Sequence, residues 1–408
     1  MKNYLLLSIV FIPSFTISAQ NTDKIAAFLD CEWYCDNDYI QTEIPFVNFI
    51  REAKDAQVHI LVSRNKTGSG GDHFTFRFIG LQEFTHINDT LSVSTRPDTS
   101  DDETRKAHVK LLKKGLFDFV KHSTISEHIS FVYTTPTTKD TSTVKDPWEY
   151  WIFRLGANGR VNGEEGYKSD NFNLRFTANK ITNTIKLENS ISYGQDRGIF
   201  DYDDFKLSTL TKNANANILA VSSINNHISV GAKASYKHTT YSNINHGIAF
   251  MPAIEYNIYP YSEAMEHQLR FLYGIGNQNN NYLDTTIFFK THDNYFYQQL
   301  SIDFESMQKW GSVDLGLTAK DLFLKGDKYD VSLYLNVDIR IVKGLSIYGW
   351  GSFNLNRSQI ELPSSGSNYE EVLLRQKELA SNYDYYTYVG LSYTFGSLYN
   401  NIVNTRFD

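Results

Sequence analysis

Cys31 and Cys35 are the residues with the most obvious capacity for covalent chemistry, because they are the only two cysteines among 408 residues. Four positions apart, they suit a local disulfide in an oxidising compartment. Two buried thiols, or two ligands of a metal site, are the alternatives. Zinc would need about two further ligands, and the nearby Asp30, Asp36 and His59 do not complete a recognised spacing. We therefore expect a disulfide and no bound metal.

The glycine-rich stretch TGSGG (Thr67–Gly71) is the second candidate, because glycine loops can hold phosphate groups. It lacks the Lys-Ser/Thr pair of a P-loop, and no helical pattern follows it. Instead it leads into HFTFRFIG, where Phe74, Phe76 and Phe78 alternate with polar residues. We therefore expect the loop of a β-hairpin.

Four further residues raise the possibility of hydrolysis: His238, His246, His267 and Ser242. A hydrolase needs a nucleophile beside a base, or a pair of acids. No spacing separates these residues from ordinary polar residues near strand ends. We expect no catalytic residues and no cofactor, so the chain is not expected to be an enzyme.

The composition indicates the class of protein but does not point to any reaction. Aromatic residues make up 14% of the chain, typical of β-rich proteins, and the net charge is −7. Such a charge gives no basic field that would attract nucleic acid. No segment after the N-terminus offers 18 uninterrupted apolar residues. A membrane-embedded form would therefore have to be a closed β-barrel, in which every backbone hydrogen bond is satisfied.

The first nineteen residues predict export. Lys2 supplies a positive start, Tyr4 to Phe15 an apolar stretch, and TISA a small-residue exit after Ala19. The apolar stretch is broken by Pro13 and Ser14, and it is shorter than the roughly 20 residues that span a bilayer. We expect a signal peptide at 1–19 rather than a membrane anchor.

Residues 20–133 predict a small α/β domain. Apolar strands are expected at 24–30 and 58–63, with a helix between them over 39–56 in which Pro45 should produce a kink or a late start. A second helix is expected to begin after Ser100, since Glu103 completes a capping box. The order is β-α-β-β-β-α, and the threonine-rich segment 134–147 is then expected to be a linker.

Residues 148–396 alternate apolar and polar side chains strand after strand, and they predict a transmembrane antiparallel β-barrel. About twelve strands are expected, starting near residues 148, 171, 184, 206, 227, 247, 266, 294, 312, 328, 344 and 384. Short links near 183, 225, 311 and 343 alternate with longer ones at 194–204, 277–293 and 357–383, and aromatic residues gather near strand ends. A secreted β-sandwich would show the same alternation. The barrel is favoured by the rhythm of the links and by the charges on the polar face.

Charges of both signs recur on this polar face, and we expect them in the lumen. They are Arg154, Arg160, Arg175, Lys186, Glu188, Lys233, Glu255, Arg270, Asp303, Glu305, Asp314, Lys320, Asp338 and Arg340. They can cross-link one another in an occupied lumen or line a solute path. We favour the occupied lumen. The segment 369–380, in the last long link, is expected to form a short helix, at the mouth or on the surface.

The last predicted strand, YVGLSYTF, resembles the C-terminal recognition signal of bacterial outer-membrane proteins, with Tyr388, Gly390, Tyr393 and Phe395 in its places. Here a tail, 397–408, follows the signal. Together with FLDC…CDNDYIQTEIPFVNFIREAKDAQVHILVS, this ending also resembles a group of uncharacterised outer-membrane barrels from Bacteroidota. The resemblance implies an outer-membrane protein in contact with lipid and with the barrel-assembly machinery. It also implies an N-terminal domain in the periplasm and no known activity. From the export signal, the alternation and the two-part architecture, we expect this domain to dock another envelope protein.

Overall fold

The structure is a computed structural model that describes residues 24–31, 33–68, 70–121, 123–129, 147–202, 205–264, 267–323, 328–364 and 380–396. Four predictions lie wholly or almost wholly outside these residues. They are the signal peptide at 1–19, the linker at 134–147, the helix at 369–380 and the tail at 397–408. In the described part of the chain, no helix has both the length and the apolar character needed to cross a membrane.

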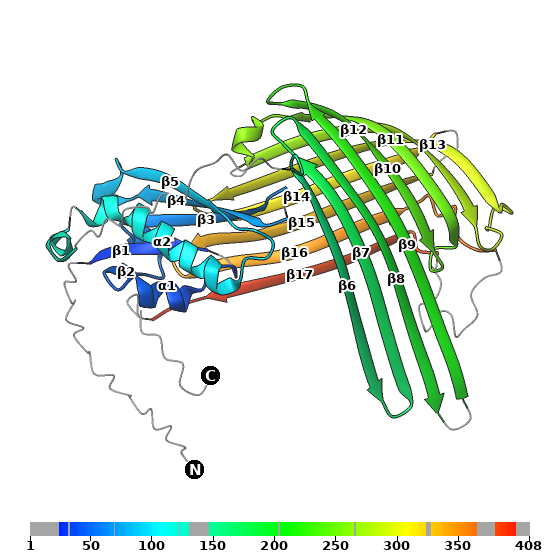
Figure 1. Cartoon of the computed structure of the whole chain (residues 1–408), viewed down its shortest axis with the longest axis horizontal. Coiled ribbons are helices and arrows are strands. Elements are labelled where there is room, and N and C mark those ends of the chain that lie inside the picture. Colours follow the sequence, from blue (N-terminus) through cyan, green and yellow to red (C-terminus); the bar gives the residue numbers. More distant parts are fainter. Residues whose placement is uncertain are drawn as a thin grey trace, which may run out of the picture.

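The N-terminal region folds as a five-stranded mixed sheet with two α-helices on one face (Figure 1). The sheet order is β2-β1-β3-β4-β5, parallel across β2, β1 and β3 and antiparallel from β3 to β5. The strands are β1 (Ile25–Asp30), β2 (Val47–Phe49), β3 (Val58–Lys66), β4 (Asp72–Gly80) and β5 (Asn88–Ser94). The helices are α1 (Asn37–Glu43) and α2 (Asp101–Val120). The hairpin predicted around TGSGG is confirmed, because Lys66 at the end of β3 pairs with Asp72 at the start of β4.

The prediction of one long helix over 39–56 was wrong in its second half. Helix α1 ends at Glu43, two residues before Pro45, whose fixed backbone and missing N–H disfavour continuation. Val47–Phe49 then pairs in parallel with β1 as β2. The apolar spacing that indicated a helix therefore belongs to a buried edge strand.

The capping box at the start of α2 is confirmed. The Ser100 hydroxyl accepts a hydrogen bond from the Glu103 backbone N–H, and the Glu103 carboxylate accepts one from the Ser100 backbone N–H. One face of α2, with Leu112, Leu116 and Phe119 fully buried, packs onto the phenylalanines of β4. This packing forms the core of the domain.

The rest of the chain forms one twelve-stranded antiparallel sheet in which every strand pairs with its neighbour in sequence. Its first six strands are β6 (Trp151–Glu164), β7 (Tyr167–Ile181), β8 (Ile185–Tyr202), β9 (Phe205–Ser223), β10 (Ile228–Thr239) and β11 (Ile244–Asn257). The other six are β12 (His267–Tyr282), β13 (His292–Gln308), β14 (Gly311–Leu322), β15 (Tyr329–Val342), β16 (Leu345–Asn356) and β17 (Tyr383–Tyr393). The twelve predicted strands are therefore present. Predicted and observed starts differ most at β7, expected near 171 and observed from Tyr167.

One expectation about this sheet is corrected and another, the closure of the barrel, is not confirmed. The long link expected at 194–204 is strand, because β8 continues to Tyr202 and pairs with β9 along its length. The sheet is curled but not closed: β6 and β17 are its two edges, and each pairs with a single neighbour (Figure 1). Alternation in single strands fixes the two faces of a sheet but carries no information about whether its edges meet.

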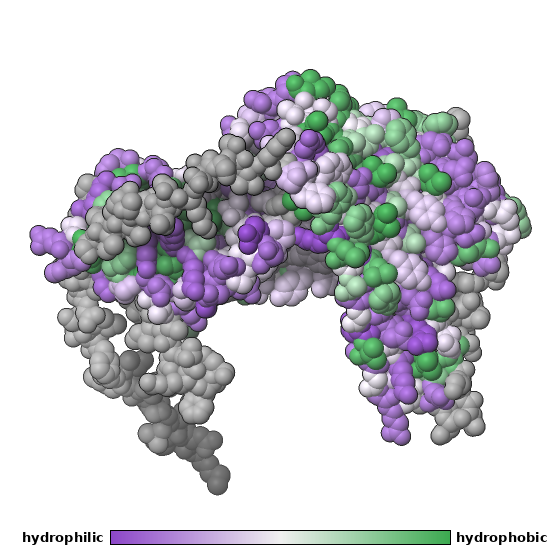
Figure 2. Space-filling view, in the orientation of Figure 1, coloured by the Kyte–Doolittle hydropathy of each residue, from purple (hydrophilic) through white to green (hydrophobic). Residues whose placement is uncertain are grey.

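The two faces of the sheet carry different kinds of side chain, as the residues paired across neighbouring strands show. One apolar or aromatic row crosses the eight strands β10 to β17 through paired residues: Ile228, Tyr256, Phe271, Ile302, Leu317, Leu333, Phe353 and Tyr385. The neighbouring row, one residue along each strand, faces the other way: Ser229, Glu255, Leu272, Ser301, Thr318, Ser332, Asn354 and Asp384. Figure 2 shows hydrophobic residues gathered across the middle of the visible sheet, with hydrophilic residues at the tips of β6–β9 and over the N-terminal domain.

Candidate functional site at the junction of domain and sheet

The N-terminal domain lies against the end of the sheet that carries the short turns (Figure 1). Its helices cover one face of its own sheet, so Val58, Ile60 and Val62 of β3 point into the core. His59 and Leu61 point to the opposite face, as strand alternation requires. Both are nevertheless buried, with 1% and 5% of their surface exposed. The turn end of the twelve-stranded sheet covers this face.

Arg340, at the end of β15, makes a two-bond contact between the two parts. Its guanidinium donates from both terminal nitrogens to the carboxylate of Asp30 at the end of β1, with the Nη1 bond at 2.6 Å. Its Nη1 also donates to the Lys309 carbonyl at 3.3 Å, and the guanidinium lies 5.2 Å from the centre of the Phe28 ring. On the domain side, His59 Nε2 lies 3.0 Å from Asp30 Oδ2. A two-bond arginine–carboxylate pair fixes orientation as well as distance.

The Asp30 carboxylate is ionised in this arrangement. Burial alone raises the pKa of Asp30, but the hydrogen bonds from His59 and Arg340 together lower it below its usual value. Docking therefore stabilises the charged form of Asp30, since Arg340 belongs to the sheet and Asp30 to the domain.

The turn between β15 and β16 supplies two further contacts. Lys343 forms an ion pair with Asp55 of the domain. The backbone N–H of Gly344 donates to Glu52 Oε2 at 3.1 Å, and the Glu52 side chain is 8% exposed. Gly344 has φ +73°, a conformation that glycine adopts without a steric penalty, so the turn can present its N–H to the carboxylate.

Contacts elsewhere extend the junction across the turn end of the sheet. Arg154 of β6 donates to the Gly70 carbonyl at 3.3 Å, in the glycine loop. Thr75 of β4 is 7% exposed and lines a small cavity together with Ser262, between β11 and β12, and Met307 of β13. The domain therefore meets both the first strand of the sheet and its later turns.

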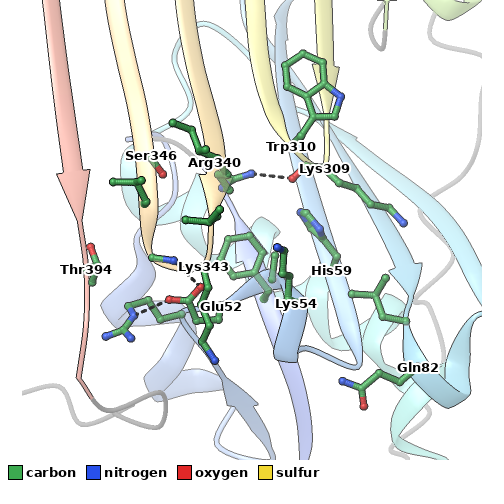
Figure 3. Close-up of a pocket in the computed structure, with 18 residues that line it drawn as sticks. Glu52, Lys54, His59, Gln82, Lys309, Trp310, Arg340, Lys343, Ser346 and Thr394 are labelled. Atoms are coloured by element: carbon green, nitrogen blue, oxygen red, sulfur yellow. Dashed lines mark hydrogen bonds and ion pairs between the residues drawn. The ribbon is translucent and has the colours of Figure 1, made fainter.

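A cavity of about 590 Å³ lies within the junction (Figure 3). Residues of the domain, including Phe28, Lys54 and Leu81, form one side, and residues near the ends of β13–β16, including Lys309 and Trp310, form the other. Figure 3 shows Lys54 coming from the domain and Lys309 from the turn between β13 and β14.

The charges predicted for a lumen fall into several groups. Arg175, Glu188 and Lys233 line one cavity of about 490 Å³ whose wall runs from β7 to β13, so the polar face is the enclosed one in this part of the sheet. Lys186 pairs with Glu188 at 3.4 Å.

A second group joins β11, β12 and β13. Arg270 contacts Asp303 at 3.0 Å and Glu255 at 3.7 Å. Glu305 and Asp314 are paired across β13 and β14, and Lys320 lies 4.3 Å from the centre of the Tyr297 ring.

Two of the predicted lumen charges do not lie free on the polar face, because Arg340 binds Asp30 and Arg154 binds the glycine loop. Both side chains belong to the polar face of the sheet, and the domain covers that face at the turn end. Arg160 of the edge strand β6 and Asp338 of β15 keep their positions on the same face, opposite Asn171 and Tyr348 respectively.

The opposite end of the sheet is crossed by two loops that join each other. Thr286 and Pro363 form an isolated β-bridge, and the Ile287 N–H donates to the Leu362 carbonyl at 2.8 Å. Asn243 donates to the carbonyls of Asp284 at 3.0 Å and Glu361 at 2.9 Å. Loop residues 360–364 are thereby held over the β11–β14 end of the polar face.

Cys31 and Cys35 form a disulfide with 6.0 Å between their Cα atoms, directly after β1 and next to Asp30. Among the described residues, no group of three or more His, Cys, Asp or Glu is arranged to hold a metal ion.

The histidines considered for hydrolysis have separate partners. His246 lies 2.9 Å from the Tyr236 hydroxyl, His238 lies 2.7 Å from the Asn245 carbonyl, and His267 pairs with Glu263 at 3.2 Å. No hydrogen bond links Ser242 to these histidines in the part of the chain that the structure describes.

The C-terminal signal residues lie on or just after β17. Tyr388, Tyr393 and Phe395 are exposed, whereas Gly390 pairs with Tyr348 of β16, so closely that a Cβ at Gly390 would lie 2.2 Å from the Tyr348 ring.

Asp30, Glu52 and Asp55 are the junction residues that sequence reasoning missed as a group. Asp30 and His59 were considered only as metal ligands. The one available signal was Arg340, a charge at the end of a strand beside a turn, but its partner is 310 positions away in sequence.

Comparisons with known proteins add little to this description. No family model matches the chain, and no curated protein matches it. Among solved structures, it aligns with CdiB from Acinetobacter baumannii at 8% identity and a TM-score of 0.30, over 91% of this chain and 74% of that one. A similarity of this size does not establish a shared fold.

Proposed function

We propose that this chain is an outer-membrane β-barrel protein whose α/β domain lies in the periplasm, covers the turn end of the barrel and presents its outer surface to another envelope component. In this proposal β6 and β17 pair in the bilayer and close the sheet. The protein acts by docking rather than by catalysis, and it belongs with the uncharacterised outer-membrane barrels that its sequence resembles.

The apolar row from Ile228 to Tyr385, with a mostly polar row one residue away, is the observation that carries the proposal. Large apolar side chains are exposed along the sheet, among them Ile248 at 60%, Phe250 at 55% and Ile254 at 50%. Soluble monomers rarely expose contiguous apolar patches above about 600 Å². Strands of 11 to 19 residues are also long enough to cross a bilayer, which takes roughly 9–11 residues.

A β-sandwich would need a second sheet over the apolar face. Among the described residues, the other sheet is the five-stranded one, and its apolar face is already covered by α1 and α2. Hydrocarbon is therefore the environment that fits the apolar face of the larger sheet.

The test is a heat-modifiability gel on the membrane fraction of cells that express the full chain. Folded outer-membrane barrels resist SDS until they are boiled, so we expect the unboiled protein to migrate faster than the boiled protein. A protein that stays in solution without detergent, with the same migration in both samples, would contradict the proposal.

A narrow solute channel is the second candidate, favoured by the cavity of about 490 Å³ lined by Arg175, Glu188 and Lys233. Asn243→Ala removes the amide that holds both loops at the far end, so a channel should show higher conductance in planar bilayers with this variant than with the wild type. Lys233→Gln should then change its ion selectivity. If neither protein conducts, the occupied barrel of the main proposal stands.

A further inference from the structure

The junction cavity carries an excess of positive charge. Five basic side chains line it, Arg51, Lys54, Lys309, Arg340 and Lys343, against one acidic side chain, Glu52. Arg340 and Lys343 are neutralised by Asp30 and Asp55, which lie just outside the lining. Even with these two carboxylates counted, five positive charges face three negative ones.

Lys54 and Lys309 account for the excess. In the part of the chain that the structure describes, neither ammonium group has an acidic partner, although every other basic group of the cavity is near a carboxylate. The two lysines come from opposite walls, one from the domain and one from the sheet (Figure 3). A ligand between them would therefore bridge the two parts of the protein.

The remaining wall is apolar and reaches the outer face of the sheet. Phe28, Leu81 and Leu345 line the cavity. Ile341, Val342 and Trp310 line it as well, and they are 47%, 53% and 45% exposed, so the same wall continues onto the face that we assign to hydrocarbon. An exposed tryptophan is typical of the boundary between membrane and water.

We propose that this cavity binds the phosphate-bearing headgroup of an anionic phospholipid, between Lys54 and Lys309, with the acyl chains running along Ile341 and Val342. The inference rests on the proposed membrane location. Ammonium groups bind phosphate as point charges, and basic pockets at a membrane surface recognise anionic headgroups. The bound lipid joins domain and sheet, so it strengthens the docked state.

The experiment uses the full chain in nanodiscs or detergent and measures lipid binding by native mass spectrometry. Phosphatidylglycerol is compared with phosphatidylcholine of the same acyl chains. We expect the wild type to favour phosphatidylglycerol about tenfold, and the double variant Lys54→Ala/Lys309→Ala to lose this preference. The matched control is Lys110→Ala/Lys114→Ala, two exposed lysines of α2 away from the cavity, and it should behave as wild type.

Two further arms separate the outcomes. Brominated phosphatidylglycerol should quench Trp310 in the wild type, and a Trp310→Phe variant should lose that part of the quenching. Inorganic phosphate at millimolar concentration is the competitor. If it binds the cavity as strongly as the lipid does, the ligand is a free phosphate compound and the lipid assignment is wrong.

Equal binding of both lipids, or an unchanged preference in the double variant, would also overturn the inference. A heat-modifiability gel on the same samples shows whether the barrel has formed. A wild-type protein that shows the gel shift but no lipid preference contradicts only this inference, whereas a wild-type protein without the gel shift contradicts the proposed function.

Discussion

His108 is a buried, titratable side chain in an apolar environment. It is 0% exposed and packs between Phe74 and Phe76, with ring centroids 4.4 and 5.2 Å away. Neither ring nitrogen has a hydrogen-bond partner among the described residues. Burial lowers the pKa of His108 to about 4, so the imidazole is neutral in the folded domain.

This histidine should make the domain sensitive to acid. Because its folded pKa lies below the unfolded value of 6.5, its contribution is complete above pH 6.5 and lost as the pH falls to about 4. We expect the domain to be about 3 kcal/mol less stable at pH 4 than at pH 7 from this group alone. His108→Phe should flatten that dependence in urea titrations followed by hydrogen exchange of α2. An equally steep profile in the variant would show that another group is responsible.

Arg340 and Lys343 form a matched pair of junction contacts with different burial. Arg340→Ala leaves the Asp30 carboxylate, 13% exposed, without its main partner, and should cost the docked state about 2 kcal/mol. Lys343→Ala removes a pair whose side chains are 52% and 36% exposed, and should cost less than about 1 kcal/mol.

Hydrogen exchange of the Gly344 backbone N–H, which donates to Glu52 across the junction, measures both effects. Equal protection from exchange in the two variants would contradict the larger contribution that we assign to Arg340. The contribution of Asp30 itself is present above its unfolded pKa of about 3.8 and lost below it, so experiments at pH 7 measure it in full.

At the scale of the strand, β15 provides a direct comparison of its two faces. Leu333 belongs to the apolar row and Asn336 to the opposite face. An arginine on the lipid face of a barrel costs about 2–4 kcal/mol at the bilayer midplane. Leu333→Arg should therefore reduce the heat-resistant folded fraction strongly, and Asn336→Arg should not. If Asn336→Arg reduced the folded fraction more than Leu333→Arg did, the face that carries Asn336 would be the one that meets lipid.

The last hairpin depends on one close contact. Gly390 lies directly opposite Tyr348, whose ring occupies the space that a Cβ would need. Gly390→Val should slow or prevent barrel assembly, visible as a loss of the heat-modifiable form. Combination with Tyr348→Ala should restore part of it, because the second change removes the ring. Failure of this rescue would show that Gly390 is needed for another reason.

Sequence reasoning succeeded where one strand or one helix end carries the signal. The alternation in Tyr329–Ile341 located β15, and Ser100 with Glu103 located the start of α2. It failed at Val47–Phe49, because Val47 lies at helical spacing from Ile44 and Ile50 although it belongs to a strand of three residues. It also failed at 194–204, which was expected to be a long link but extends the β8–β9 hairpin. Arg197 in this segment pairs with Asp170 at 2.8 Å.

The junction could not be predicted, because its contacts join residues that lie between 84 and 310 positions apart in the sequence. Nothing local distinguishes Arg340, which binds Asp30, from Asp338, two residues earlier on the same face. The turn that exposes Gly344 to Glu52 likewise has no signal beyond the glycine itself. Whether a charge faces a lumen or a neighbouring domain depends on tertiary packing.

At the scale of the whole molecule, both ends of the polar face are covered. The domain lies over the turn end through Asp30, Glu52 and Asp55, and the paired loops hold Ile360 and Leu362 over part of the other end. The middle of the sheet shows its apolar side outward. The proposed function accounts for these features by one requirement, that one face meets hydrocarbon and the other is enclosed.

Spin-label accessibility along β15 tests this requirement most directly. Single cysteine variants from Val331→Cys to Val337→Cys, in the full chain reconstituted into lipid, are labelled and probed with oxygen and with a water-soluble nickel complex. The described native cysteines are joined in a disulfide, so they leave the label no free thiol there. We predict high oxygen accessibility at 331, 333, 335 and 337 and low oxygen accessibility at 332, 334 and 336. Low accessibility to both reagents at the apolar positions would place them inside a protein core and contradict the account.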